Sequence, residues 1–242
     1  MQSRALCGRF TQHFTWSRLR ALLDLRWPDA PALRESYNTA PTQDALVVLL
    51  NEQGEPGARP MRWGLVPSWA KSASVGSRMI NARAETLARK PAFRAALERR
   101  RCIVPVSGFY EWAKADGGKR PMHIVRDDRE PMLLAGLWER WDDGSGPLET
   151  FTIITLPAAP SLRAIHDRMP AVLEPDRAPH WLGVGSAPPR PAPALPDPTD
   201  APRFCIWPVS SRVNSPRAND ARLIEPVPED APRPAEPGLF ER

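Results

Sequence analysis

The side chain whose surroundings most suggest chemistry is a carboxylate among aromatic residues. Glu111 lies between Tyr110 and Trp112 in a strand-like run. A carboxylate that alternates with large rings either faces solvent or is held in a shielded site that raises its pKa. These residues alone leave both alternatives open.

The three cysteines give no sign of a disulfide framework or a zinc site. They are odd in number, widely spaced and form no CxxC pair, whereas zinc sites and disulfide scaffolds need close or paired cysteines. Cys102 and Cys205 each lie inside an apolar run, so both are expected to be small buried hydrophobic residues.

Seven segments, taken together and in order, give a stronger signal than any single residue. They are CGRF (7–10), YNTAP (37–41), RWGLVPSW (62–69), NARAET (81–86), GFYEW (108–112), IHDRMP (165–170) and WPVS (207–210). This series closely resembles the SOS-response-associated peptidase (SRAP) family, whose members protect abasic sites in single-stranded DNA. The resemblance spans about residues 7–228.

The resemblance implies that Cys7 reacts as an N-terminal residue. An N-terminal cysteine carries two adjacent nucleophiles, an α-amine with a pKa of about 7.7–8.0 and a thiol with a pKa of about 8.5. The amine condenses with the aldehyde of a ring-open abasic site to an imine, and the thiol then closes a five-membered thiazolidine. An imine alone promotes β-elimination and strand breakage, which ring closure prevents. An internal cysteine cannot react in this way because its nitrogen is an amide.

By the same resemblance, three further residues complete the catalytic group. Glu111 holds and deprotonates the α-amine, a task that suits a carboxylate in a shielded pocket. His166 donates the proton that opens the deoxyribose ring, since histidine titrates near neutral pH. Asn81 orients the sugar or the cysteine through its neutral amide.

The resemblance also implies a set of DNA contacts. Arg9 and Arg83 are expected to grip flanking phosphates, and Trp69 and Pro41 to stack against or wedge exposed bases. Ala70 departs from the family pattern, because many relatives have a second aromatic residue after Trp69. One stacking surface is therefore expected to be missing.

A second departure is that six residues, MQSRAL, precede Cys7. While they are attached, the Cys7 nitrogen is an amide and the covalent chemistry is impossible. Three explanations compete: the start site is assigned too early and Leu6 is the true initiator, the protein cleaves its own Leu6–Cys7 bond, or this copy does not crosslink. The first is the explanation we favour, with residues 1–6 as an extension or a mis-assigned start.

Two alternative functions stay open from the sequence. One is a cysteine autopeptidase or thiol hydrolase, with Cys7 as nucleophile and His166 as base, in keeping with the family's peptidase name. The other is a module that binds single-stranded DNA without a covalent bond. The main hypothesis is a DNA-repair protein of the DNA-damage (SOS) response with possible lyase character, which crosslinks to abasic sites.

The elements that must position these residues indicate an α+β fold. Helices are predicted over residues 15–26, where Thr15 is suited to capping, and 91–100, where Pro91 suits the first turn. Strands are predicted at 45–50 and 61–66, and then in the runs RCIVPV, GFYEWAK, PMHIVR, MLLAGLW and TFTIITL. Their short connections favour antiparallel pairing. The expectation is a single domain with a mostly antiparallel, curved or barrel-like core and a few flanking helices, the SRAP fold.

The ends and one insert of the chain are set apart by composition. Residues 185–202 are proline-rich and are predicted to form a surface insert within the SRAP domain at 7–228. The last residues, 229–242, are typical of a disordered tail.

Charge and hydropathy agree with a protein that binds nucleic acid. The formal net charge is +5, and residues 1–120 carry 20 basic and 10 acidic side chains, which suits a polyanionic partner. No apolar run approaches the ~18 residues of a membrane span, and the N-terminus does not have the apolar stretch of a signal peptide. We expect a cytoplasmic monomer, associated with chromosomal DNA, whose partner is single-stranded DNA containing abasic sites. It is expected to need no metal, no cofactor and no membrane.

Overall fold

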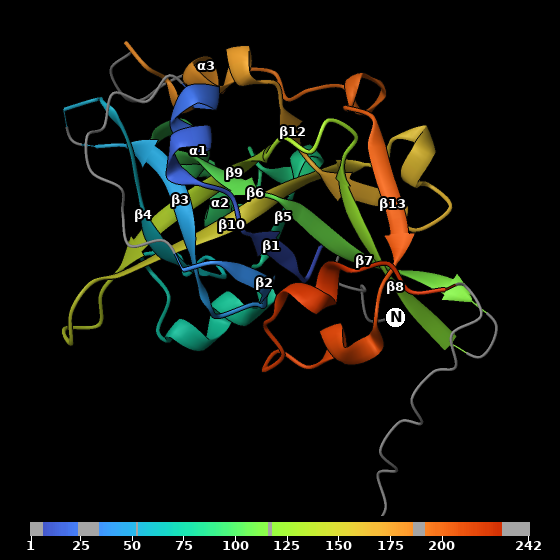
Figure 1. Ribbon diagram of the computed structural model, residues 1–242. Coiled ribbons are helices and arrows are strands. Elements are labelled where there is room, and N and C mark those ends of the chain that lie inside the picture. The colour runs from blue at the N-terminus through green and yellow to red at the C-terminus, as the bar shows by residue number, and fades with distance from the viewer. Residues whose placement is uncertain (1–6, 24–33, 52, 116–117, 186–191, 229–242) are drawn as a thin grey trace, which may run out of the picture.

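The computed structural model describes residues 7–23, 34–51, 53–115, 118–185 and 192–228. These residues form one α+β unit built from a closed barrel and a second, open sheet (Figure 1). The predicted fold class is therefore confirmed. The N-terminal extension at 1–6, the tail at 229–242 and part of the proline-rich insert (186–191) lie outside the described residues.

Five strands close the barrel. They are β3 (Asp44–Leu50), β4 (Pro56–Trp63), β6 (Arg101–Val106), β9 (Met132–Trp141) and β10 (Leu148–Pro157). The order β10-β4-β3-β6-β9 returns to β10, because β9 and β10 also pair with each other. All of these pairs are antiparallel except β10 with β4. A parallel pair is possible here because a long stretch of chain separates the two strands.

Alternation along the barrel strands separates an inner core from an outer one. Val47 and Leu49 of β3 belong to the inner cluster, whereas Leu46 and Val48 belong to the cluster that contains helix residues. Trp63 and Phe151, which lie 6.4 Å apart and stacked, are fully buried in the inner cluster. The helices α1 (Trp16–Leu23), α2 (Pro91–Arg99) and α3 (Ala178–Leu182) cover the outer cluster.

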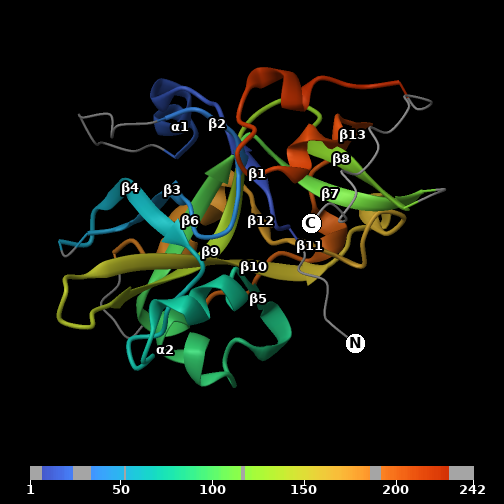
Figure 2. The same cartoon turned by 90° about the horizontal axis from the view of Figure 1, so that it is seen from below.

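The second sheet has the order β13-β8-β7-β1-β2 and is antiparallel throughout. Its strands are β1 (Phe10–Gln12), β2 (Ser36–Thr39), β7 (Gly108–Ala115), β8 (Gly118–Arg126) and β13 (Phe204–Pro208). In Figure 2 the barrel strands lie to one side and β7, β8 and β13 to the other, with α2 at the far side of the barrel. Ser107 is the single residue between β6 of the barrel and β7 of this sheet.

Three short strands extend the barrel. β5 (Asn81–Arg83) runs parallel to β10, whereas β11 (Arg168–Pro170) pairs antiparallel with β10 and β12 (Val172–Leu173) with β9. β5 aligns with Ile153–Thr155 and β11 with Thr155–Pro157, so the C-terminal part of β10 lies between β5 and β11.

Most predicted elements are found within a few residues of their expected bounds, and one strand is displaced. The strand expected at 61–66 spans 56–63 and ends before Gly64. Gly64 has φ +119, and the carbonyl oxygen of Gly76 lies 2.5 Å from where a Cβ of Gly64 would stand. Such a φ is incompatible with an extended strand of L residues, so the prediction was wrong beyond Trp63. The helix expected at 15–26 is described over 16–23.

Candidate active site

The pairing of β1 with β7 brings Cys7 to Glu111. Phe10 is aligned with Phe109 in antiparallel register, so residues preceding β1 run beside residues that follow Phe109. The backbone N–H of Cys7 donates a hydrogen bond to Oε1 of Glu111 at 2.6 Å. Two residues that are 104 positions apart in the chain thus meet through one short contact.

Burial decides the charge state of both groups. Glu111 is 5% exposed and Cys7 is fully buried. Burial raises the pKa of Glu111 from an ordinary 4.5 to about 7, although the backbone hydrogen bonds from Cys7 and Trp112 oppose the change. Burial and the nearby Glu111 charge raise the pKa of the Cys7 thiol well above its usual range. The alternative of a shielded carboxylate, left open by the sequence, is therefore the correct one.

Cys7 also has an unusual backbone. Its φ is +44, one of three positive values at non-glycine residues among those described. Positive φ values are uncommon at non-glycine residues, and this backbone conformation costs free energy. The hydrogen bond to Glu111 fixes the Cys7 nitrogen in this conformation.

His166 lies in the segment that leads into β11, with its ring held by neighbouring polar groups. Nδ1 accepts a hydrogen bond from the backbone N–H of Arg168 at 3.1 Å, and Oδ1 of Asp167 lies 2.8 Å from the same nitrogen. Nδ1 accepts from Arg168 only when it carries no proton, and donates to Asp167 only when it carries one. The two contacts are therefore alternatives that depend on whether Nδ1 carries a proton.

Asp167 connects the His166 segment electrostatically to the Cys7–Glu111 pair. Its negative charge contributes to the raised pKa of Glu111, which requires the two carboxylates to lie within each other's field. Of the predicted catalytic residues, Cys7 and Glu111 are joined directly, and His166 is next to a residue whose charge Glu111 senses.

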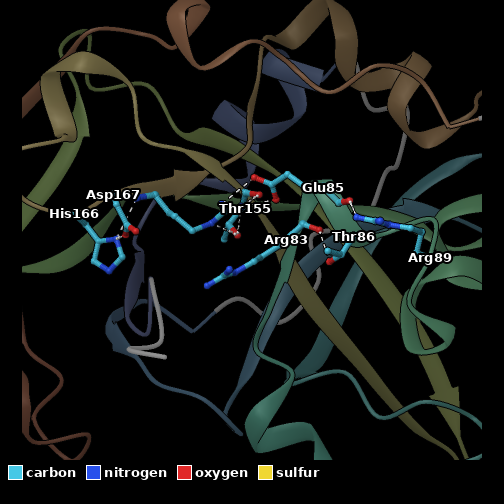
Figure 3. Close-up of polar contacts among 8 residues, drawn as sticks. Arg83, Glu85, Thr86, Arg89, Thr155, His166 and Asp167 are labelled. Carbon is cyan, nitrogen blue, oxygen red and sulfur yellow. Dashed lines mark hydrogen bonds and ion pairs between the residues drawn. The ribbon is translucent and has the colours of Figure 1, made fainter. Parts of the chain in front are cut away.

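β5 carries the fourth predicted catalytic residue and one predicted DNA contact. Asn81 is partly buried and aligned with Ile153, and Arg83 is exposed and aligned with Thr155. Residues two apart in a strand share a face, so both side chains lie on the same side of β5. In Figure 3 the Arg83 side chain extends from the end of β5 toward the side on which His166 lies.

Two residues without a predicted role, Glu85 and Arg168, join the end of β5 to the His166 segment. The guanidinium of Arg168 donates to both carboxylate oxygens of Glu85, at 2.9 and 3.0 Å, and to the carbonyl oxygen of Thr155 at 2.7 Å (Figure 3). A bidentate pair of this kind fixes geometry as well as adding energy. Both residues lie in segments that carry the family resemblance, Glu85 in NARAET and Arg168 in IHDRMP, so the sequence could have pointed to them. Their contact forms because β5 and β11 both pair with β10, and no sequence spacing indicates that pairing.

The other predicted DNA contacts differ in their surroundings. Trp69 is 65% exposed, as a base-stacking residue must be. Pro41 is partly buried in the turn between β2 and β3, where the N–H of Thr42 donates to the Trp63 carbonyl oxygen at 2.8 Å. No contact described here joins Trp69 or Pro41 to Cys7.

Arg9 has internal partners that the sequence did not suggest. Its guanidinium donates to Oδ1 of Asn38 at 2.8 Å and to the carbonyl oxygens of Val213 and Asn214. These bonds tie the segment before β1 to the segment after β13. The predicted phosphate contact of Arg9 stays a prediction, and anchoring is the role its contacts describe.

No group of three or more His, Cys, Asp or Glu side chains within the described ranges is arranged to hold a metal ion. No helix in that part of the chain is long and apolar enough to cross a membrane.

Comparison with known proteins gives consistent matches over most of the chain. The family model described as SOS response associated peptidase (SRAP) matches residues 6–216. "Abasic site processing protein YoaM" of Bacillus subtilis (strain 168) is 40% identical over 91% of this chain and 98% of its own length. "Abasic site processing protein HMCES" of Gallus gallus is 31% identical over 94% of this chain and 80% of its own.

Solved structures agree with this comparison. A protein from Bordetella bronchiseptica superposes with a TM-score of 0.68 and 25% identity, covering 84% of this chain and 100% of that one. A protein from Bacteroides thetaiotaomicron superposes with a TM-score of 0.67 and 26% identity, covering 81% and 87%. The likeness in structure therefore extends over most of the described fold.

Proposed function

Since this chain belongs to the SOS response associated peptidase (SRAP) family, we propose that it processes abasic sites in single-stranded DNA by forming a covalent thiazolidine through Cys7. Relatives named abasic site processing proteins support the substrate. The observation that carries the proposal is the 2.6 Å hydrogen bond from the Cys7 nitrogen to Glu111. It joins the Glu111 carboxylate to the atom that, once it is an amine, must lose a proton.

The reaction assigns each proton to a group in the site. Protonated His166 gives a proton to the deoxyribose ring oxygen while the C1′ hydroxyl loses its proton to solvent, which frees the aldehyde at C1′. Glu111 takes a proton from the Cys7 ammonium, and the amine adds to C1′ and loses one water to give an imine. The Cys7 sulfur then adds to the imine carbon, and the thiol proton passes to the nitrogen. The adduct has the combined mass of protein and DNA less one water.

This chemistry requires Cys7 to be the first residue of the reacting protein. Initiation at Leu6 followed by removal of the initiator Met would supply that terminus, as would cleavage of the Leu6–Cys7 bond. Either route converts the amide now bonded to Glu111 into an amine at the same position. The buried thiol then becomes the second nucleophile, and its high pKa keeps it protonated until the imine has formed.

DNA binding is proposed to use the face on which β5 ends. Arg83 is exposed there and supplies a positive charge for a phosphate. Trp69 supplies an exposed ring for stacking, with Pro41 as the predicted wedge. Asn81, on the same face of β5 as Arg83, is proposed to orient the sugar.

A thiol hydrolase is the competing function, and the charge state of Cys7 disfavours it. A cysteine hydrolase needs a thiolate activated by a base. Here burial raises the pKa of the thiol, and the described contact of Cys7 is made by its nitrogen. Thiazolidine formation needs that nitrogen and starts from a neutral thiol.

The test compares two forms of the chain, one beginning at Met1 and one with Met directly before Cys7. Each is incubated with a single-stranded oligonucleotide that contains one abasic site, and the products are examined on a denaturing gel and by intact mass. We expect a heat-stable adduct, lighter by one water than its parts, from the form that begins at Cys7. If the Met1 form reacts, it will have lost MQSRAL.

Three controls separate the alternatives. Cys205→Ser replaces an internal cysteine, and this variant should still crosslink. Cys7→Ala and acetylation of the Cys7 amine should both abolish the adduct. A hydrolase that acts through the thiol would survive acetylation. No adduct from either form would refute the covalent mechanism and leave a non-covalent DNA-binding module.

A further inference from the structure

A cavity on the other face of the second sheet has no part in the proposed reaction. It measures about 440 Å³, and its walls include His13, Ser107, His123, Arg129 and Trp207. His123 is aligned with Tyr110 and Trp207 on the neighbouring strands, whereas Phe109 is aligned with Ile124 and packs in the barrel-side core. Alternation therefore places the cavity on the face away from Glu111. Its volume lies within the range of about 300–1,000 Å³ for small-molecule sites.

The cavity wall contains a buried polar group without a partner. His123 is 1% exposed, and neither ring nitrogen has a hydrogen-bond partner among the described residues. Burial lowers the pKa of His123 to about 3, so at neutral pH the ring is uncharged and offers one donor and one acceptor. Buried groups of this kind are nearly always satisfied in proteins, by protein, water or a ligand.

Gly108 leaves the space that this ring occupies. A Cβ at Gly108 would stand 2.5 Å from Nε2 of His123 and 2.8 Å from Cγ1 of Val125. Any side chain here would displace the imidazole or close that end of the cavity. The glycine therefore keeps the polar ring at the cavity wall.

The remaining walls supply aromatic faces and an uncommitted positive charge. The His13 ring lines the cavity and is stacked on Tyr37, with the ring centroids 5.0 Å apart. The exposed Arg129 guanidinium lies 4.8 Å from the Trp207 ring centroid, and no acidic partner of it is found within the described ranges. Its backbone has φ +62, a costly conformation for arginine.

We propose that this cavity binds an unpaired nucleobase together with its phosphate. The base stacks on His13, and the neutral His123 ring, whose two nitrogens are enclosed in the free protein, turns to exchange hydrogen bonds with it, since base edges offer donors and acceptors together. The phosphate pairs with Arg129. The ligand is either a free nucleotide or a nucleotide of a bound single strand, and only the second source rests on the proposed function.

The test follows the ring signals of the four histidines by NMR while deoxyadenosine monophosphate (dAMP) is added. We expect the His13 and His123 signals to move and the signal of His180, which is exposed on α3, to stay unchanged. Arg129→Gln should weaken binding about tenfold, as loss of one charged hydrogen bond does. Arg203→Gln, which removes an exposed arginine paired with Asp127 outside the cavity wall, should have no effect.

A second comparison ties the phosphate to Arg129. Deoxyadenosine, which has no phosphate, should bind the unchanged protein about tenfold more weakly than dAMP and should be insensitive to Arg129→Gln. Movement of the His123 signal with an unmodified single-stranded oligonucleotide, but not with dAMP, would identify the strand as the source of the base.

Two outcomes would overturn the proposal. One is a His123 signal that stays unchanged with dAMP and with the unmodified oligonucleotide, each at millimolar concentration. The other is a His123 signal that moves as far with inorganic phosphate alone as it does with dAMP. Neither ligand contains an abasic site, so the outcome does not depend on crosslinking by Cys7.

Discussion

Replacement of Glu111 by Gln should make the folded protein more stable at alkaline pH while it removes the base of the reaction. In the unfolded chain this carboxyl loses its proton near 4.5, and in the folded protein near 7. The folded state therefore binds more protons between these values, and stability falls as the pH rises through them. The difference, at about 1.36 kcal/mol for each pKa unit, is about 3 kcal/mol.

Relative to the unchanged protein, the free energy of unfolding of the variant should rise little below pH 4.5 and by up to about 3 kcal/mol above pH 7. Gln carries no charge that burial would penalise, and its oxygen still accepts the hydrogen bond from the Cys7 nitrogen. The measurement is urea denaturation of the form that begins at Met1, in which the Cys7 nitrogen is an amide, followed by tryptophan fluorescence at pH 5 and pH 8. Glu98→Gln, on the exposed side of α2, is the matched control and should change stability equally at both.

The titration of His123 does not affect the difference in stability between the variant and the unchanged protein. Its lowered pKa makes the folded protein lose stability as the pH falls from 6.5 toward 3, but it does so in both proteins and cancels in their difference. Crosslinking by the Cys7-start form should slow about 10²-fold or more in the variant, the usual contribution of a general base. A stability difference that is the same at pH 5 and pH 8 would show that Glu111 is not held in a shielded site.

Three other substitutions test the proposed contacts. Arg83→Gln should reduce the salt dependence of single-strand binding by about one charge, whereas Arg94→Gln on α2, on the outer side of the barrel, should leave the slope unchanged; equal slopes for both would make Arg83 structural. Trp69→Ala should weaken binding by about 1–3 kcal/mol through lost stacking, with an unchanged denaturation midpoint because the side chain is 65% exposed. Arg9→Gln should lower the free energy of unfolding by about 1–3 kcal/mol, and a loss of DNA affinity without a loss of stability would contradict the anchoring role.

The barrel strands and flanking helices could be predicted because their signals are local. The apolar run ALVVLL and the capping residue Thr15 are properties of a few neighbouring residues. The end of β4 at Trp63 could not be predicted in the same way. It is set by the close approach of Gly64 to Gly76, which is a contact between segments.

The candidate site also combines features that depend on neighbouring residues with features that depend on contacts between distant segments. The sequence identified Glu111 as unusual, but only the Phe10–Phe109 register decides that it faces Cys7 and not solvent. The Arg168–Glu85 pair went without a role for the same reason, as β10 brings the two residues together. Arg9 has the residue type of a phosphate ligand, and its type gave no indication of the carbonyl oxygens that surround it.

The contact between Cys7 and Glu111 also links the stability of the site to its activation. While Leu6 is attached, the Cys7 nitrogen is a neutral amide, and burial of Glu111 is offset only by hydrogen bonds. An N-terminal Cys7 would place an ammonium charge 2.6 Å from Oε1, and an opposite charge this close lowers a carboxyl pKa by about 1–3 units. The form that begins at Cys7 should therefore hold Glu111 ionised at neutral pH, ready to accept the ammonium proton. In the longer form the same carboxyl is half-protonated near pH 7 and has no amine to deprotonate, so exposure of the amine both supplies the nucleophile and ionises its base.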